Sequence, residues 1–481
     1  RAAPDRPVPS PVMHPRRHTP DAAIAPIERW FASRDWSPFS FQRDCWRAYL
    51  NHESGLLHAP TGTGKTLAVW LGPIAESLAH ADAEPSGIRV VWLTPLRALA
   101  GDTTDALAES ARALGSPWTI EARTGDTTSA RKARQRGRLP SALVTTPESL
   151  TILMSHADWA ERFRSLVCVV VDEWHELLGT KRGVQTELAL SRLRALCPDL
   201  RTWGVSATLG NLDEAAAALV GPAAPPPRLI RGAEPKKIEI QTLLPASIDR
   251  FPWAGHIGTA LADQVLSAID AAGTTLLFTN TRSQAEIWFR TLLTRRPDLL
   301  GKLALHHGSL DRDIRTEVER MLRADRAHKS ELRCVVCTSS LDLGVDFAPV
   351  DQVIQVGSPK GVARFVQRAG RSGHRPGAPS RIVCVPSHAL ELIEFAAARD
   401  AISAGALESR PALRKPLDVL AQHLVTAGMG GGFDDAALLA EVRSTHAFAE
   451  LTDEEWGWAM DFVGRGGPAL TAYPQYARVA P

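Results

Sequence analysis

Short runs of apolar residues alternate with longer segments of helical periodicity along the first half of the chain. The runs have no polar face, and they predict strands at residues 88–94, 118–123, 142–145, 166–171 and 202–206. Strands that are apolar on both sides and alternate with helices are typical of a parallel sheet with helices on both faces. An amphipathic helix precedes them, with Ile27, Trp30 and Phe31 on one side.

The second half of the chain repeats this alternation. Its predicted strands span residues 276–279, 303–306, 334–337, 352–356 and 382–385. Between the two halves lies a Pro-rich stretch, residues 221–227, which is semi-rigid and predicts a domain boundary. The sequence therefore predicts two α/β domains, 21–227 and 228–405.

Both ends of the chain differ from the α/β halves. Residues 1–20 are rich in Pro and Arg and predict a disordered extension. From Pro411 the pattern changes to short helices, predicted at residues 417–426, 434–443 and 453–462, with a hairpin at 469–479. Three helices and a hairpin resemble a winged helix, which we assign to residues 406–481. We expect this module to brace the second α/β domain, with Trp458 and Phe462 in its core.

The composition argues against a zinc site and a membrane-spanning protein, and says little else about function. The chain has 481 residues, enough for about three domains. A formal charge of +2 gives no global sign of a nucleic-acid partner. The only close pair among its six cysteines, Cys334 and Cys337, has no second pair to complete a zinc site. No apolar run approaches the roughly 20 residues of a membrane helix, and because the chain starts at Arg1 we expect a piece of a longer protein.

A phosphate-binding loop follows the apolar run at residues 55–58. It reads Ala59-Pro60-Thr61-Gly62-Thr63-Gly64-Lys65-Thr66, with Ala59 in place of the usual first glycine. Between a strand and a helix, such a loop turns backbone N–H groups toward phosphate oxygens at the positive end of the helix. Lys65 is expected to reach the β and γ phosphates of ATP, and the Thr66 hydroxyl to bind Mg²⁺. Upstream, the Gln42 amide could pair with the adenine edge.

Two further clusters carry chemistry. Asp172 and Glu173 follow a buried strand, where Asp172 would hold Mg²⁺ and Glu173 would orient and deprotonate the attacking water. The stretch 367–374 carries Arg368 and Arg371, which can face one cleft and stabilise a transferring phosphoryl group. Arg371 is our first choice for this role. The alternatives are an acidic helix start and a solvated Arg-rich turn.

These stretches, in chain order, resemble the motifs of superfamily 2 helicases. The matching residues are 59–66, 94–98, 146–150, 172–175, 206–208, 278–282, 338–346 and 367–374. His175 places the chain with the DExH group. Residues 172–177, Arg182-Gly183 and 367–374 look like the large-helicase-related (Lhr) family and its ligase-associated bacterial branch. Many relatives in the superfamily have Arg where this chain has His374, so the pair of arginine fingers would be Arg368 and Arg371.

The resemblance implies two tandem RecA-like parallel-sheet domains, a winged helix and a further C-terminal domain that this chain lacks. It also implies a set of site residues. The catalytic set is Lys65, Asp172, Glu173, His175, Gln367, Arg368 and Arg371. The nucleotide set is Gln42, Thr61, Gly62, Thr63, Gly64, Lys65, Thr66, Gly344 and Asp346, with Thr66 and Asp172 on the metal. The nucleic-acid set is Thr94, Arg97, Thr146, Thr279 and Thr338.

A basic run adds one open question about nucleic-acid contacts. It consists of Arg131, Lys132, Arg134, Arg136 and Arg138. It could line a nucleic-acid path, or it could be a solvated helix face.

The implied function is ATP-driven, Mg²⁺-dependent translocation 3′ to 5′ on single-stranded DNA. The implied substrates include duplexes and RNA:DNA hybrids, and the implied setting is DNA repair at the bacterial nucleoid in the cytoplasm, away from any membrane. A ligase and a nuclease are possible partners. The alternative is a nucleotide-gated clamp, or an RNA-directed ATPase, that does not translocate.

Overall fold

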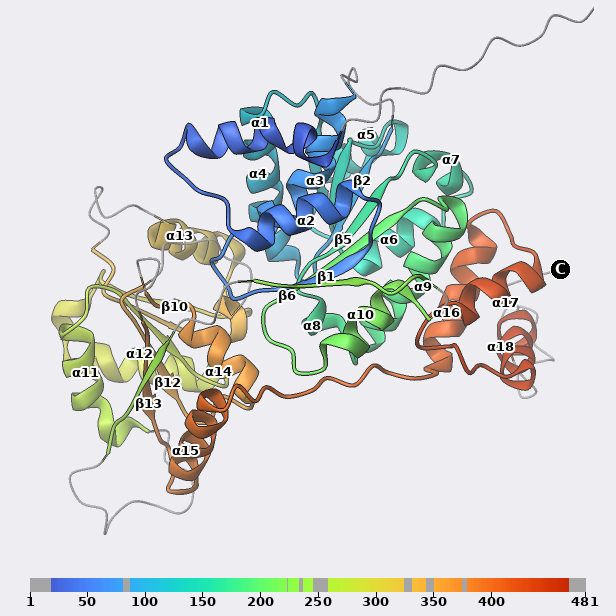
Figure 1. Ribbon diagram of the computed structural model, residues 1–481. Coiled ribbons are helices and arrows are strands. Elements are labelled where there is room, and N and C mark those ends of the chain that lie inside the picture. The colour runs from blue at the N-terminus through green and yellow to red at the C-terminus, as the bar shows by residue number, and fades with distance from the viewer. Residues whose placement is uncertain are drawn as a thin grey trace, which may run out of the picture.

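A computed structural model describes residues 19–80, 87–222, 224–232, 237–244, 258–323, 331–342, 350–373 and 379–466. These residues form two parallel sheets, each covered by helices, and a group of helices at the C-terminal end (Figure 1). The predicted α/β fold class is therefore confirmed.

The first sheet has seven parallel strands in the order β3-β4-β2-β5-β6-β1-β7. Their bounds are β1 (Gly55–His58), β2 (Val90–Leu93), β3 (Ile120–Arg123), β4 (Ala142–Thr145), β5 (Cys168–Val171), β6 (Arg201–Ser206) and β7 (Arg228–Arg231). β2, β4 and β5 are buried along their whole length. All five predicted strands of this half are present. Burial on both faces explains the unbroken apolar runs of the central strands, whereas β3 lies at the edge of the sheet and is only partly buried.

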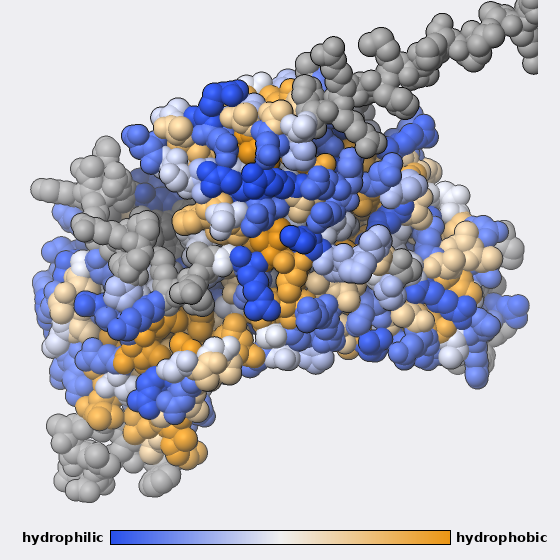
Figure 2. Space-filling view, in the orientation of Figure 1, coloured by the Kyte–Doolittle hydropathy of each residue, from blue (hydrophilic) through white to orange (hydrophobic). Residues whose placement is uncertain are grey.

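Helices cover both faces of this sheet. Their bounds are α1 (Pro20–Ala32), α2 (Ser40–Leu50), α3 (Lys65–Ala79), α4 (Arg97–Ala113), α5 (Ser129–Gly137), α6 (Pro147–Met154), α7 (Trp159–Phe163), α8 (Trp174–Leu177), α9 (Lys181–Leu196) and α10 (Leu212–Val220). One core joins α1 to α4 with the sheet, and another joins α6 to α10 with the opposite face. The outward sides of α1 and α2 are largely hydrophilic (Figure 2).

β7 corrects the expected domain boundary at residue 227. This strand pairs with β1, with Gly55 opposite Arg228, and belongs to the first sheet. Its sequence, Arg-Leu-Ile-Arg, leaves only Ile230 buried, as is usual for an edge strand. The first domain therefore extends beyond the Pro-rich stretch, to Gly232 or later.

The second sheet has six parallel strands in the order β10-β11-β9-β12-β13-β8. Their bounds are β8 (Ile238–Thr242), β9 (Thr275–Phe278), β10 (Leu303–His306), β11 (Cys334–Cys337), β12 (Gln352–Val356) and β13 (Ser380–Val385). The covering helices are α11 (Ala262–Asp270), α12 (Arg282–Arg295), α13 (Arg312–Arg323), α14 (Val362–Ala369) and α15 (Leu390–Ser403). All five predicted strands are present, and the edge strand β8, which is exposed at every second residue, was missed.

The C-terminal helices are α16 (Leu417–Met429), α17 (Asp435–Arg443) and α18 (Asp453–Arg465). Thr452 caps α18, because its hydroxyl accepts a hydrogen bond from the Glu455 N–H at 3.1 Å and the Glu455 carboxylate accepts one from the Thr452 N–H. The predicted hairpin at 469–479 lies outside the described residues, as does nearly all of the predicted disordered extension.

These helices pack on the first α/β domain, so the expected brace to the second domain is wrong. Val184 and Leu188 of α9 share a core with Leu420 and Leu424 of α16. Figure 1 shows α16 and α17 beside α9, reached by an extended segment that leaves α15 and runs along the first domain. The sequence could not show this, because the apolar residues of α9 equally fit a helix that covers only its own sheet.

α18 also differs from expectation in the side that it buries. Trp458 and Phe462 stack at 5.6 Å between ring centroids, but their exposed fractions are 52% and 45%. The buried residues of the helix are Trp456, Ala459 and Val463. Spacing of four residues places two side chains on one side of a helix, but it does not determine which side faces the core.

A buried carboxyl at this contact leads to a prediction about pH. Glu187 of α9 is buried, and its Oε2 accepts a hydrogen bond from the Ala447 N–H at 2.9 Å. Burial raises the pKa of Glu187 from its usual 4.5 to about 8. The folded chain therefore binds more protons than the unfolded chain between these values, and its stability falls as pH rises through this window.

We predict that Glu187→Gln, which keeps the acceptor oxygen and cannot ionise, removes part of this pH dependence. Above pH 8 the variant should melt higher than the parent, by about 2–4 °C for each kcal/mol recovered in a domain of this size. Near pH 5 the two melting temperatures should coincide. Thermal unfolding followed by circular dichroism measures both, and identical pH profiles would refute the assignment.

Candidate active site

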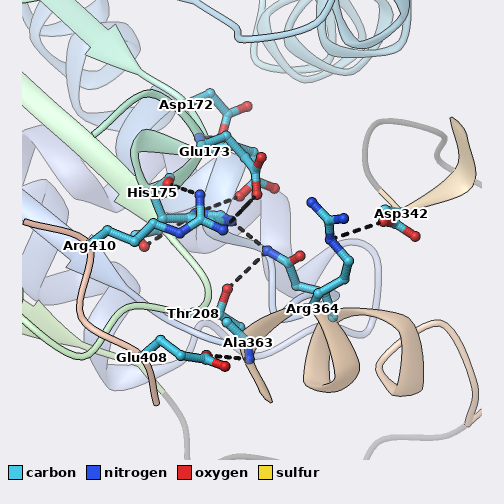
Figure 3. A network of polar contacts seen from close by, with 12 residues as sticks. Asp172, Glu173, His175, Thr208, Asp342, Ala363, Arg364, Glu408 and Arg410 are labelled. Carbon is cyan, nitrogen blue, oxygen red and sulfur yellow. Dashed lines mark hydrogen bonds and ion pairs between the residues drawn. The ribbon is translucent and has the colours of Figure 1, made fainter. Parts of the chain in front are cut away.

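The acidic cluster after β5 and Thr208 after β6 lie opposite residues of the second α/β domain (Figure 3). The loop after β1, the acidic residues after β5 and the residues after β6 lie at the carboxyl ends of strands in the first sheet. Helix α14 of the second domain faces them. Ligands of open parallel sheets bind at this edge, so the site is assembled from both domains.

The loop between β1 and α3 has the backbone of a phosphate cradle. Gly62 and Gly64 have φ values of +77° and +78°, a left-handed conformation that glycine adopts at little cost. The Thr63 hydroxyl donates to the Pro60 carbonyl at 2.8 Å and closes the turn. Lys65 and Thr66 then start α3, so the first free N–H groups of the helix lie beside the loop.

Gln42 is placed differently from the expectation. Its Oε1 accepts from the Phe39 N–H at 2.9 Å, and its Nε2 donates to the Gly64 carbonyl at 3.1 Å. The amide therefore braces the phosphate loop from α2, and its contact with adenine stays a prediction. The sequence could not separate these two uses of one amide.

Two buried groups of opposite charge at the site have no hydrogen-bond partner among the described residues. They are Nζ of Lys65 and Oε2 of Glu173. A buried charged group without partners is costly. Orphaned cationic and anionic groups on one cleft are what a phosphate chain with a bound cation and a water molecule would satisfy, so the residues present fit ATP and Mg²⁺.

The acidic pair is held by the strands around it. Oδ1 of Asp172 accepts from the Glu173 N–H at 2.9 Å, and Oδ2 accepts from the Trp92 indole N–H at 3.2 Å. Burial and the neighbouring Glu173 raise the pKa of Asp172. Burial alone would raise the pKa of Glu173 too, but Lys65, His175 and Arg371 outweigh it and lower that pKa. Of the two carboxyls, Glu173 is therefore the one whose ionised form its charged neighbours favour.

Glu173 also has a strained backbone. Its φ and ψ are +45° and +46°, the left-handed region that is rare for residues with a side chain. Such a conformation costs on the order of 1 kcal/mol or more and persists only where neighbouring contacts enforce it. The strain lies between the buried strand β5 and the short helix α8.

One amide connects the two domains at this point. Nε2 of Gln367 donates to Nε2 of His175 at 2.6 Å and to the Thr208 hydroxyl at 2.9 Å. Burial lowers the pKa of His175 to about 4, so its ring is neutral. Nε2 then accepts from Gln367, and Nδ1–H points to the Ser206 hydroxyl at 3.3 Å. Three separate motifs therefore share one buried hydrogen-bond network.

The two predicted arginine fingers differ in their surroundings. Arg368 is almost fully buried, and its Nε and Nη2 bind both oxygens of Asp342 at 2.7 and 3.1 Å. Its Nη1 donates to Gln355 at 2.7 Å, so its guanidinium is engaged within the second domain. Nη2 of Arg371 donates to the Asp342 carbonyl at 2.9 Å, and its charge lowers the pKa of Glu173 in the first domain. The sequence could not show that the Asp342 carboxylate would bind the guanidinium of Arg368.

Arg364 is a third arginine near Asp342, and the sequence reasoning did not select it. It lies one turn before Arg368 on α14, is partly exposed, and its Nε lies 3.6 Å from the Asp342 carboxylate (Figure 3). The i, i+4 spacing from Arg368 was the available signal. Three other predicted positions, Gly344, Asp346 and His374, lie outside the described residues.

Most of the predicted nucleic-acid threonines have a local partner. The hydroxyls of Thr94 and Thr279 donate to the Leu96 and Thr281 carbonyls, and that of Thr146 caps α6. Thr338 is also buried. The backbone N–H groups of Thr94, Thr279 and Thr338 also donate to carbonyls of neighbouring strands. These residues therefore shape the ends of their strands, and their contact with a nucleic acid stays a prediction.

Arg97 lies in a groove between the two domains. A cavity of about 660 Å³ separates α4 and α5 from α13. Its cationic lining comes from both sides, from Arg97, Arg131, Arg312 and Arg315. The lining also includes Glu319 and Asp126, and Asp126 pairs with Arg97 at 3.2 Å. Guanidinium groups suit phosphate contacts that position a strand without reading its sequence.

The basic residues at 131–138 were expected either to line a nucleic-acid path or to form a solvated helix face, and the structure places some of them in each setting. Arg131 lines the groove, whereas Arg134 pairs with Glu121 at 2.5 Å on the outer side of α5. α13 supplies the two cations on the opposite wall, which the sequence reasoning did not select.

Comparison with protein families agrees with this arrangement. Residues 39–215 match the model of the DEAD/DEAH box helicase, and residues 259–376 match the helicase conserved C-terminal domain. Residues 400–481 match the winged helix domain of the large helicase-related protein. The chain belongs to the Lhr helicases. The winged-helix prediction and the predicted order of domains are thereby confirmed.

Individual Lhr proteins support this assignment. The ATP-dependent helicase Lhr-Core of Methanothermobacter thermautotrophicus is 34% identical over 442 residues, which are 88% of this chain and 50% of that protein. The Lhr helicase/probable uracil glycosylase of Mycolicibacterium smegmatis is 31% identical over 92% of this chain and 32% of its own length. A structure of Mycobacterium smegmatis Lhr bound to ssDNA and AMP-PNP matches with a TM-score of 0.81 at 32% identity, covering 92% of this chain and 57% of that one.

The chain thus spans about half the length of the Lhr-Core proteins that it matches. Among the described residues, no helix is long and apolar enough to cross a membrane.

We predict that two substitutions separate nucleotide binding from hydrolysis. Lys65→Ala removes the cation beside the phosphate loop and should abolish ATP turnover. Glu173→Gln keeps the shape but cannot accept a proton, so ATP should still bind while turnover falls by about 10²–10⁴-fold. Steady-state hydrolysis and binding of a fluorescent ATP analogue measure the two effects.

The control for these variants is Glu161→Gln, which changes an exposed glutamate on α7. It should turn over ATP at the parent rate. Parental turnover in Glu173→Gln would show that Glu173 is not the base.

Proposed function

We propose that this Lhr chain is an ATP-driven motor that moves 3′ to 5′ on single-stranded DNA and unwinds duplexes, including RNA:DNA hybrids, in DNA repair. The observation that carries the proposal is the site between the domains. Nζ of Lys65 and Oε2 of Glu173 lie on the first domain and have no hydrogen-bond partner among the described residues. From the second domain, Gln367 contacts His175, and the charge of Arg371 acts on Glu173. Binding and hydrolysis of ATP at this site would therefore depend on how closely the two domains approach each other.

The residues have separate roles in hydrolysis. The loop of Thr61 to Thr66 and the ammonium of Lys65 hold the phosphates. Thr66 and Asp172 would hold Mg²⁺, which supplies positive charge to the phosphate oxygens when it is bound. Glu173 orients a water molecule toward the γ-phosphate and takes its proton, and Arg371 stabilises the charge on the transferring phosphoryl group.

The groove beside this site supplies the track. Cations from both domains line it, so a bound strand would bridge α4 and α5 on one side and α13 on the other. Closing and opening around ATP would then move one set of contacts relative to the other. The direction of movement, action on RNA:DNA hybrids and a role beside a ligase and a nuclease rest on the resemblance to the ligase-associated Lhr branch.

One experiment tests the proposal against its alternative. Unwinding of a labelled duplex is measured in a single turnover with a 3′ overhang, a 5′ overhang or blunt ends, and with DNA or RNA as the displaced strand. ATP-dependent unwinding from the 3′ overhang supports the motor. ATP hydrolysis stimulated by a strand without any unwinding would instead favour a nucleotide-gated clamp or an RNA-directed ATPase.

We predict that ATP hydrolysis depends on a bound strand through Arg371. The phosphate loop and Arg371 lie on different domains, so both can act on one γ-phosphate only when the domains are closed. Arg371→Ala should lower the strand-stimulated kcat by about 10³–10⁵-fold, the usual effect of removing an arginine finger. Arg399→Ala, on the exposed side of α15, is the matched control. Equal turnover by the parent with and without single strands would contradict this account.

A second prediction concerns the groove. Changing both Arg312 and Arg315 to Ala should weaken single-stranded DNA binding and flatten its salt dependence by about 0.7 in slope for each lost phosphate contact. Arg320→Ala is the matched control on the same helix, because Arg320 pairs with Glu317 at the surface. Fluorescence anisotropy over a range of salt concentrations measures the slope, and an unchanged slope in the double variant would exclude α13 from the path.

A further inference from the structure

The segment that joins the second domain to the winged helix crosses both halves of the active site. It comprises residues 405–416, between α15 and α16, and is called the strap below. Figure 1 shows it leaving the second domain and running along the first toward α16. Its path passes α8 and the residues after β6, the two parts of the first domain that carry the acidic pair and Thr208.

The backbone of the strap is anchored to the first domain. The Asn211 side chain binds Arg410 reciprocally, donating to its carbonyl and accepting from its N–H, each at 2.9 Å. The Gly210 N–H donates to the Glu408 carbonyl at 3.2 Å, and Glu214 accepts from the Ala412 N–H at 2.9 Å. These anchors come from the segment immediately after the 206–208 motif.

Three glycines from distant parts of the chain make room for the strap. A Cβ at Gly210 would lie 2.6 Å from the Leu407 carbonyl oxygen, and one at Gly179 would lie 2.8 Å from that of Pro411. At Gly361 a Cβ would lie 3.0 Å from the Glu408 carboxylate. The strap is thus fitted against the loops after the acidic pair, after β6 and before α14.

One side chain of the strap holds the second domain. The carboxylate of Glu408 accepts hydrogen bonds from the N–H groups of Val362 and Ala363, the latter at 2.8 Å (Figure 3). These are the first residues of α14, where free N–H groups and the helix dipole favour a carboxylate. α14 carries Gln367, so Glu408 grips the helix that contacts His175.

A second side chain, two residues further on, holds the acidic turn of the first domain. Nη1 of Arg410 donates to the His175 carbonyl at 2.5 Å, and Nη2 lies 3.5 Å from the Glu176 carboxylate (Figure 3). This turn begins with the left-handed backbone of Glu173. A strained turn needs contacts that enforce it, and Arg410 supplies them from outside the domain core.

We propose that Arg410 is a positioning residue for ATP hydrolysis, which holds the turn that aims Glu173 while Glu408 ties the same strap to α14. Movement of α14 away from the first domain must then release Glu408 or displace Arg410. The strap makes the aim of the Glu173 carboxylate dependent on domain closure. This inference rests on the proposed ATPase and adds a residue outside the helicase motifs.

A passive linker accounts for less of the structure. Backbone contacts alone would be enough to lay a linker along the first domain, as Asn211 and Glu214 show. A linker held by its backbone would not also need the side chains of Glu408 and Arg410, which bind different domains beside the active site. The strap also offers its own control, because Arg414 faces solvent and pairs with Glu450, away from the acidic turn.

The test measures kcat and the KM for ATP with single-stranded DNA in the 481-residue chain. Arg410→Ala should lower kcat by about tenfold or more with a smaller change in KM, because misplacing a reacting group by about 1 Å can cost about 100-fold. Arg410→Lys keeps a donor for the His175 carbonyl and should recover part of the rate. Arg414→Ala should match the parent.

Glu408 provides an independent arm. Glu408→Ala should also lower kcat, and its effect should not add to that of Arg410→Ala, because both act through one strap. Should Arg410→Ala fail to fold, the Glu408 variants and Arg410→Lys decide the question. Thermal unfolding and titration with a non-hydrolysable ATP analogue count the folded sites in each sample.

The outcomes separate the inference from the proposed function. A parent that does not hydrolyse ATP refutes the proposed function. A hydrolysing parent whose Arg410→Ala variant keeps the full kcat per folded site refutes only the role of the strap. If kcat falls only in proportion to the loss of folded sites, the role of the strap is also refuted, because Arg410 then contributes to folding alone.

Discussion

The two domains of this Lhr chain are joined at their reacting edges by the buried amide of Gln367. Its two N–H groups are spent on His175 and Thr208, at 2.6 and 2.9 Å. A buried acceptor that loses its donor costs about 1–3 kcal/mol, so separating the domains here is penalised unless water replaces both bonds. The neutral state of His175 follows from the same burial. The position of Arg371 relative to Glu173, and hence the shape of the site, depends on this contact.

The second constraint is the strained turn at Glu173. A short helix after a fully buried strand has little freedom, and the left-handed residue at its start must be enforced by neighbours. Asp172 supports it from within through the Glu173 N–H, and Arg410 supports it from the strap. The winged helix fixes the far end of that strap, because α16 and α17 pack on α9 of the first domain. The helices α16 and α17 thereby hold the far end of the segment that carries Glu408 and Arg410.

Sequence reasoning succeeded where burial and local chemistry coincide. The central strands, the phosphate loop and the acidic pair were all located, because two-sided burial leaves unbroken apolar runs and a phosphate cradle needs glycines at set positions. It missed two of the four edge strands, β7 and β8, and it could not choose between equivalent partners. β7 and β8 carry polar residues because one side of each strand is exposed. Arg368 has the right chemistry for a phosphate, but Asp342 binds it first.

The sequence by itself determined the class of fold, the order of the domains and the phosphate loop that we propose binds ATP, since each of these follows from local periodicity or from side-chain chemistry. Only the tertiary structure decided which partners those residues meet. The winged helix packs on the first domain, and Trp458 is exposed. Glu408 binds the second domain, whereas Arg410 binds the first. These are long-range contacts between segments that are each compatible with several neighbours, so local sequence carries too little information to select among them.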